Sequence, residues 1–481
     1  MEIRELEKIA GLLFLFGFAA PAAGLLMNGR RHLQRLGFAV LCFMIPSGIF
    51  KPEEWGLTLA SLDLTAHFYR GHATGYHFYF VEAVALALVL ARALQDWREF
   101  RLIPPGLFLY FAYCALSFVS IVNAPSANFV CMAALKAFKI AIVFIAGYNF
   151  LDSEKEMETF LLAMSGTVLV QFLAVMRQRY LLGVYQVNGT FEHQNSLSMF
   201  VTMFGLVLLA VALGPARRWS NFYFAVYLIC AFIQESTFSR GGIVIFAAGS
   251  MGVAMLSLWD RMTRRRLASL AVLGAVGLLG LALSFDTIRA RFNDYGNEAS
   301  GMTRVLLNQA ARNMVSDHPL GIGWNNFAFV INRPFTYGNI IDEWELEGGA
   351  TIDPRHQKGI VESLYYLVLS ETGWQGLLSL LLFMLLFLWW NARAACFYRY
   401  HFLGSLSLGI AVGCGCNYLQ STLERVLIQP RNMMLWLLLL AVSARVHVWQ
   451  KEDALTPAPS DKASNENTPV LTADQPRSLA P

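Results

Sequence analysis

The sequence predicts an all-α membrane protein that crosses the bilayer about 12–13 times, and composition is the first reason. Of the 481 residues, 56% are hydrophobic and only 15% are charged, whereas soluble globular chains are about 25% charged. The second reason is a repeated apolar run close to the roughly 20 residues that a spanning helix needs. Backbone polar groups in lipid must be paired within the segment, which favours helices over irregular chain.

About thirteen apolar runs qualify as spans by hydropathy, and one of them, 36–50, is short. In chain order the runs lie near residues 9–27, 36–50, 77–94, 104–122, 130–150, 158–177, 195–213, 221–235, 241–258, 267–285, 363–390, 402–419 and 431–448.

The loops between these runs alternate in charge. One set is short and basic or of mixed charge, and the positive-inside rule places it in the cytoplasm. Its members are Arg30, Arg31 and Arg35; Arg98 and Arg101; residues 152–158; Arg217 and Arg218; Arg261, Arg264, Arg265 and Arg266; and Arg393 and Arg399. The second set must face the opposite side and consists of residues 51–76, 123–129, 178–194, 236–240, 286–362 and 420–430. The two sets interleave without conflict, which supports the predicted spans.

The spans and loops divide the chain into four regions. Residues 1–285 and 363–450 are the N-terminal and C-terminal parts of a transmembrane bundle. Between them lies one large polar loop, 286–362, which we expect to contain short helices because residues 305–316 have a helical pattern. The tail 451–481 is rich in Pro, Ser, Thr, Ala, Asp and Asn, so we expect a disordered cytoplasmic segment.

Several kinds of chemistry are not indicated. The sequence has no P-loop, no dinucleotide fingerprint and no G-x-S-x-G elbow. We therefore expect no cofactor, and the energy for any reaction must come with the substrate. The acidic stretch 342–347 lacks a calcium-loop pattern, and Cys414 and Cys416 lack zinc-site spacing, so no metal is expected. The net charge of +4 gives no indication of a nucleic-acid partner, and none is expected.

Four short polar motifs stand out in the second set of loops and at their edges. They read NGTFEHQNSL at 188–197, FSRGG at 238–242, DHPLGIGWNNF at 317–327 and ESLYYLVLSETGWQG at 362–376. In this order they resemble the O-antigen ligase/polymerase superfamily, with its G-T-F-x-x-x-N, S-R-G and E-x-G signatures. The resemblance extends over roughly residues 100–440, and the order of the motifs makes it more specific than any one of them.

The resemblance implies a GT-C-like, multi-pass glycosyltransferase of the bacterial inner membrane with a periplasmic active face. Such enzymes need no metal. They move a glycan from an undecaprenyl-diphosphate carrier to an acceptor hydroxyl in cell-surface polysaccharide assembly. The acceptor is a lipid A-core sugar in ligases and another lipid-linked glycan in polymerases. The implied partners are the lipid-diphosphate glycan, an acceptor glycan or glycolipid, and membrane lipid.

The sequence departs from the family at the proposed catalytic base. Family ligases have a histidine in H-N-x-Y-L ahead of E-x-G, and counting back from Glu371 places Glu362 at that position. A positioned, partly desolvated carboxylate can accept a proton from a sugar hydroxyl. Glu362 is therefore the candidate base, and His356, whose spacing does not match, is the second candidate. An acidic residue here slightly favours a polymerase over a ligase. The structural alternative is a carboxylate stabilised by a helix N-terminus.

In the family, outward arginines hold the diphosphate, and five cationic residues are candidates here. Arg240 lies where the chain re-enters the membrane, and an arginine there can contact phosphate oxygens through two donors. Lys136 and Lys139 lie three apart within an apolar run, so they share a helix face and are expected to face a cavity or partner. Arg304 and Arg179 complete the set. The alternatives are snorkelling for the membrane-edge residues and a solvated surface for Arg304.

Four residues are candidate glycan or acceptor contacts. His193 and Asn195 lie where the chain re-enters the membrane, and Trp324 and Tyr365 can stack on sugar rings. Structural packing is the alternative for all four. Glu371, inside an apolar helix, is expected to pair with a buried cation.

Two other functions compete with the enzyme. A transporter or lipid-glycan flippase would often show internal repeats and charged midplane residues, and no repeat is evident. A non-catalytic subunit of an export complex would use the large loop as an assembly surface, and the missing family histidine leaves this alternative open.

Overall fold

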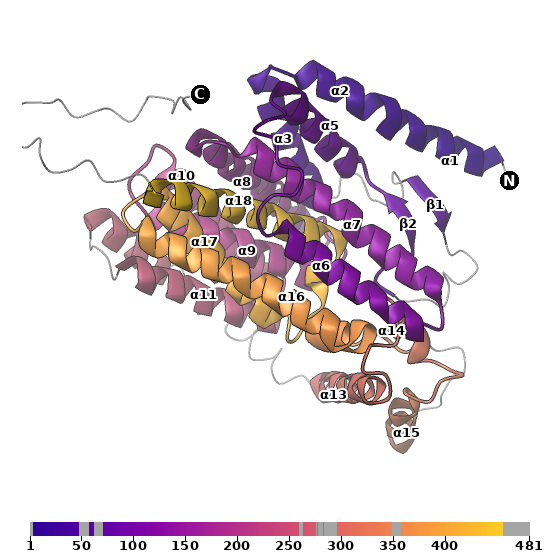
Figure 1. The fold of residues 1–481 in the computed structure, drawn as a ribbon. Helices are drawn as coiled ribbons and strands as arrows, with labels where there is room; N and C mark the ends of the chain where they lie inside the picture. The colour runs from indigo at the N-terminus through magenta and orange to yellow at the C-terminus, as the bar shows by residue number, and fades with distance from the viewer. Residues whose placement is uncertain are drawn as a thin grey trace, which may run out of the picture.

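The structure, a computed structural model, describes residues 3–47, 57–61, 71–258, 263–275, 277, 282, 296–348 and 357–455. In chain order the elements are α1 (Ile3–Phe14), η1 (Leu15–Ala19), α2 (Ala20–Met27), α3 (Arg31–Ser47), β1 (Leu57–Ser61), β2 (Gly75–Phe78), α5 (Phe80–Gln95), α6 (Leu107–Phe118), η2 (Val119–Asn123), α7 (Ala127–Phe150), α8 (Glu154–Met176), η3 (Arg177–Leu181), α9 (Gln194–Leu213), α10 (Ser220–Ser236), α11 (Arg240–Leu258), α13 (Gly296–Asp317), α14 (Phe327–Val330), α15 (Asn339–Glu347), α16 (Leu364–Phe397), α17 (Phe402–Gln420), η4 (Val426–Ile428) and α18 (Pro430–Leu455). Long helices form a bundle, and the β-hairpin and the short helix α14 lie toward one end of it (Figure 1).

The predicted all-α membrane fold is confirmed. Among the described residues, eight helical segments are long and apolar enough to cross a membrane. Four more predicted runs form helical segments of 16 or 17 residues, namely α3, α5, α10 and α6 continued by η2. Eight and four make twelve, and the predicted run 267–285 is helical over the described stretch 264–275. The described helices therefore agree with about 12–13 spans.

α9 is the centre of the bundle, because every residue from Asn195 to Leu213 is buried. α10, α11 and α17 pack around it, and α18 is the other largely buried helix, lying against α7 and α16. α16 instead has an exposed stripe of large apolar side chains at helical spacing: Leu378, Leu382, Leu385 and Trp389. An apolar stripe open to the surroundings is what a lipid-facing helix presents.

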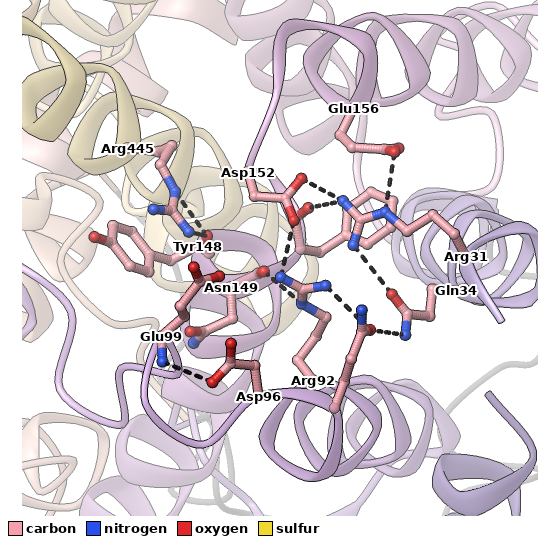
Figure 2. A network of polar contacts seen from close by, with 12 residues as sticks. Arg31, Gln34, Arg92, Asp96, Glu99, Tyr148, Asn149, Asp152, Glu156 and Arg445 are labelled. Carbon is pink, nitrogen blue, oxygen red and sulfur yellow. Dashed lines mark hydrogen bonds and ion pairs between the residues drawn. The ribbon is translucent and has the colours of Figure 1, made fainter. Parts of the chain in front are cut away.

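The loops of the basic set are joined by a network of polar contacts (Figure 2). Arg31 at the start of α3 pairs with Asp152 and, at 3.2 Å, with the buried Glu156. Arg92 at the end of α5 reaches the same Asp152 at 2.8 Å, and Arg445 of α18 donates to a backbone carbonyl at the end of α7. Ion pairs from α3 and α5 to the segment 152–156, together with the hydrogen bond from Arg445 of α18, thus hold this group of loops together.

Loops of the second set also contact one another. The Asn325 side chain exchanges two hydrogen bonds with the backbone of Ala73, at 3.0 and 2.7 Å. Asn123 donates to the carbonyl of Gly321 at 3.1 Å. The structure therefore gathers the polar loops into the two groups that the charge pattern predicts.

The large polar loop differs in detail from expectation. α13 has 22 residues and begins at Gly296, ahead of the stretch 305–316 that the sequence pattern indicates. Its first turns carry no apolar periodicity, and it packs against α15 and α16. The hairpin of β1 and β2, with Leu57 opposite Phe78, was not predicted.

Candidate active site

A cavity of about 320 Å³ lies among the loops of the second set. Its walls include residues 71–79, a face of α7, and the segment 425–431 that leads into α18. Four cationic side chains line it: Lys136, Lys139, Arg425 and Arg431. A concave site with this charge favours an anionic ligand.

Lys136 is fixed by the loop that precedes β2. Its ammonium donates to Nδ1 and to the carbonyl of His72, each at 2.9 Å, and to the carbonyl of Ile428 at 3.4 Å. Burial lowers the pKa of His72, and Lys136 lowers it further, so the imidazole is neutral at pH 7. Its Nε2–H then donates to Glu371, which lies 3.0 Å away and accepts a second hydrogen bond from the backbone of Phe327 at 3.1 Å.

Lys139 has a partner of its own. Its ammonium lies 2.6 Å from a carboxylate oxygen of the buried Glu82 and donates to the carbonyl of His77. The ring of Tyr79 lies 4.3 Å from the same nitrogen, at cation–π distance. Most of the Lys139 charge is therefore compensated within the cavity wall.

Arg425 connects the cavity to a cluster of acids. In the part of the chain that the structure describes, no hydrogen bond or ion pair occupies its guanidinium. Burial lowers the pKa of Arg425, and the carboxylates of Glu362, Glu424 and Glu371 oppose this effect. Because a guanidinium stays protonated in proteins, Arg425 brings an available positive charge to the cavity.

The acids near Arg425 share another arginine. One terminal nitrogen of Arg304, on α13, lies 3.0 Å from Glu362, which precedes α16, and 3.1 Å from Glu424, which follows α17. The Asn195 side chain donates to Glu424. Partial desolvation lowers the pKa of the His193 imidazole, while the nearby Glu362 raises it. Three of the predicted site residues, Arg304, Glu362 and Asn195, therefore converge on Glu424, which was not predicted.

A break in α16 explains why the motifs at 317–327 and 362–376 occur together. At Gly373 the backbone leaves the helical region, with φ 70° and ψ −174°. The carbonyls of Ser370 and Glu371 are instead paired with the N–H groups of Ile322 and Gly323, at 2.9 and 3.1 Å. The segment after α13 thus supplies the hydrogen bonds that the broken helix lacks.

Glycine is required at this junction. A Cβ on Gly321, whose φ is +89°, would overlap the carbonyl of Glu371. A Cβ on Gly373 would lie 2.5 Å from the carbonyl oxygen of Pro319. Because α13 and the first half of α16 are fastened here, the junction also fixes Arg304 relative to Glu362.

The remaining predicted cationic residues lie outside the cavity lining. Arg240 begins α11, and a Cβ on its neighbour Gly241 would be 3.2 Å from Leu423, the residue before Glu424. Arg179 donates to the carbonyl of Tyr185 at 2.8 Å and lies 4.8 Å from the ring of Phe238. Phosphate contact by either arginine stays a prediction, and the contacts of Arg179 favour a role in shaping its own loop.

The predicted sugar-contacting aromatics have structural partners. Trp324 is buried and meets Tyr113 edge-on at 5.9 Å. The hydroxyl of Tyr365 donates to the carbonyl of Tyr418 at 2.7 Å. Their roles toward a glycan stay predictions, and His356 lies outside the described residues.

The family model for O-antigen ligase matches residues 225–357. This match supports membership of the chain in the O-antigen ligase/polymerase superfamily. The matched stretch includes Arg240 and Arg304, while Glu362 and Glu371 follow it. A comparison with curated proteins found no match. The match supports an O-antigen ligase- or polymerase-type function in general, and the apolar helices point to a multi-pass membrane protein.

Sequence reasoning from this superfamily missed four residues of the site: His72, Glu424, Arg425 and Arg431. Arg431 donates to the carbonyl of Thr190 in the G-T-F motif, which joins two distant parts of the cavity wall. A signal for Arg425 and Arg431 was present, because two arginines in a loop predicted to face outward run against the positive-inside trend, whereas the acid Glu424 gave no such signal. His72 carried no comparable signal in the sequence.

Within the described residues, no group of three or more His, Cys, Asp and Glu side chains is arranged to hold a metal ion. Whether the reaction is independent of metal stays a prediction from the superfamily. Arginine and lysine side chains such as those of the cavity can stabilise phosphate charge through charge-assisted hydrogen bonds.

Proposed function

We propose that this protein is an inverting glycosyltransferase that takes its glycan from an undecaprenyl-diphosphate carrier and transfers it to an acceptor hydroxyl. We further propose that the reaction takes place at the periplasmic face during cell-surface polysaccharide assembly. The observation that carries the proposal is the cationic cavity next to Glu362. Arg425 lines the cavity and lies within electrostatic range of Glu362, so donor phosphate and base can meet at one place.

In this proposal the diphosphate occupies the cavity. Arg425 and Arg431 contact its oxygens, and Lys136 contributes charge from a fixed position. The acceptor oxygen attacks the anomeric carbon, and its proton moves to Glu362. The bond from that carbon to the phosphate oxygen breaks, and its electron pair leaves with the diphosphate. Charge developing on the leaving group is stabilised by preorganised cations, which is commonly the largest catalytic contribution.

The acid at the position of the family histidine supports a polymerase slightly more than a ligase. A polymerase would extend a lipid-linked glycan, whereas a ligase would make one transfer onto a core glycolipid. The alternatives, a transporter of lipid-glycan and a non-catalytic export subunit, do not require a base beside the cavity.

Purified protein with a synthetic lipid-diphosphate glycan and acceptor tests this proposal by release of polyprenyl diphosphate. Glu362→Gln should abolish release and preserve donor binding. Arg425→Ala should weaken donor binding roughly 10- to 100-fold, because a hydrogen bond to a charged group contributes about 1.5–3 kcal/mol. Arg177→Ala is the control, since Arg177 is exposed and outside the cavity lining.

Turnover that persists when Glu362→Gln and His356→Ala are combined would remove both candidate bases. A protein that binds the donor but never releases polyprenyl diphosphate would support the transporter or subunit instead. A ladder of products indicates a polymerase, and a single product indicates a ligase.

A further inference from the structure

The pair formed by Glu362 and Glu424 has an uncommon charge balance. Both carboxylates lie on the same terminal nitrogen of Arg304, at 3.0 and 3.1 Å. If both were ionised, the three groups would carry a net charge of −1. The two acids differ in environment, because the side chain of Glu424 is 13% exposed and that of Glu362 is 36% exposed. Desolvation therefore places the proton of the pair on Glu424.

Several elements packed around Glu424 contribute charged or polar groups. α13 contributes Arg304, the start of α16 contributes Glu362, and the N-terminus of α9 contributes Asn195 with His193 close by. Arg425 follows Glu424 in the chain, and Gly241 of α11, the neighbour of Arg240, lies close to Leu423. Burial and the neighbouring Glu362 together raise the pKa of Glu424 to about 7, against the opposing effects of Arg304 and Asn195.

The protonation state of Glu424 also determines the net negative charge next to Arg425. Arg425 lines the cavity and has no hydrogen-bonding partner among the described residues. The carboxylates of Glu362 and Glu424 attract its positive charge. With Glu424 protonated, the group of Arg304, Glu362 and Glu424 is neutral, and Arg425 keeps its full attraction for an anion in the cavity. With Glu424 ionised, a second carboxylate competes with that anion for the guanidinium.

We propose that Glu362 and Glu424 share one proton beneath Arg304, and that this proton controls how tightly the neighbouring cavity holds a diphosphate. The inference rests on the proposed function for the identity of the anion. Glu424 is then a positioning residue: it touches neither the sugar nor the phosphate but sets the charge that Arg425 presents. Affinity for the donor falls as the pH rises through the pKa of Glu424, because the ionised form is the competing one.

Binding of a synthetic short-chain prenyl-diphosphate sugar to the full protein in detergent is the measurement. Both phosphates of this probe are esterified, so its charge is constant over the pH range used. For the wild type, we expect Kd to rise from about pH 6 to about pH 8.5, by at most tenfold per pH unit for one linked proton. Glu424→Gln mimics the protonated acid and should bind tightly and equally over the whole range.

Two control variants identify the titrating group. Glu192→Gln removes an exposed carboxylate of the cavity wall and should strengthen binding by the same factor at every pH. His193→Gln should retain the dependence on pH. If His193→Gln abolishes the dependence while Glu424→Gln retains it, the histidine is the titrating group and the proposal is overturned.

An infrared titration of the protein without ligand separates this inference from the proposed function. A carboxylic acid band that is present at pH 6, lost by pH 8.5 and absent in Glu424→Gln is the expected result. Absence of that band in the wild type overturns the shared proton whether or not the probe binds. If the band is present but the probe binds at no pH, the diphosphate cavity is wrong, and so is the proton control inferred for it.

Discussion

Lys136 and Lys139 lie on one face of α7, one turn apart, and their ammonium groups have different surroundings. Lys136 donates to the imidazole and carbonyl of His72, whereas Lys139 pairs with Glu82 at 2.6 Å. The side chains of Lys139 and Glu82 are 12% and 3% exposed. Water cannot solvate either charge at this depth, so removing one residue of the pair leaves the other as an uncompensated buried charge.

We therefore expect Lys139→Met to destabilise the protein by about 3–5 kcal/mol, because it leaves the Glu82 charge buried and alone. Glu82→Gln in the same chain should recover most of this loss. Thermal unfolding in detergent of the two single variants and the double variant measures the coupling. Equal stability of Lys139→Met with and without Glu82→Gln would show that the pair is not what holds Lys139.

The site could be predicted where a residue type contrasts with its surroundings. Lys136 and Lys139 are charged residues in an apolar run, and both line the cavity. Glu362 came from the register of a motif, and the structure brings it to Arg304. Glu424 could not be chosen in this way, because its significance lies in the distance to Arg304, 120 positions earlier in the chain.

Among the elements, α16 combines two tasks that a continuous helix cannot perform. Its second half presents a lipid-facing stripe, and its first half faces the polar site, with the break at Gly373 between them. Backbone hydrogen bonds from Ile322 and Gly323 cover the break. The positive φ of Gly373 is a conformation that other residues adopt at a cost.

Gly373→Ala should cost about 1–3 kcal/mol for the backbone conformation alone, and more for the overlap with Pro319. Because the junction fixes Arg304 relative to Glu362, transfer activity should fall further than stability does. Gly301→Ala is the control, since Gly301 lies in a helix with nothing within 4 Å of its added Cβ. Thermal unfolding and turnover are measured on both variants. Equal behaviour of the two would contradict the role given to the junction.

The helices could be predicted because lipid offers no hydrogen-bonding partners. An apolar run long enough to cross the membrane must therefore form its backbone hydrogen bonds within itself, as a helix does. The break in α16 was not predicted, because residues 363–390 were treated as one continuous span although the stretch 370–376 within it is polar. Gly321 and Gly323 indicated tight turns, but their partner became visible only in three dimensions. The strands β1 and β2 alternate apolar and polar residues over only about three positions each, which is too short a pattern to predict strands.

For the molecule as a whole, the two groups of polar loops differ in what they contain. The basic group is held by compensated pairs such as Arg31 with Asp152 (Figure 2). The second group contains the cavity and Arg425, which in the described part of the chain lies within electrostatic range of three carboxylates but forms no ion pair with any of them. The sequence predicts that the first group faces the cytoplasm and the second the periplasm.

Cysteine labelling with a membrane-impermeant maleimide tests this orientation. Cys396 is the exposed cysteine among the seven, so Cys396→Ser provides the background. Thr422→Cys, in the second group, should react in intact cells, and Lys155→Cys, in the basic group, only after the membrane is opened. Both positions are exposed, so reactivity reports the side of the membrane. The reverse pattern would place the cavity in the cytoplasm and exclude a periplasmic transfer.

The two hydrogen bonds between Asn325 and the backbone of Ala73, here called the clasp, have a consequence for the synthesis of the chain. The two residues are separated by 252 positions, and the clasp orients the loop that holds His72 and, through it, Lys136. When the first half of the chain has been synthesised, its helices are therefore present but the cavity wall is incomplete. Arg425 and Arg431 are synthesised later still, so the cavity proposed for the diphosphate is complete only when nearly the whole chain has been made.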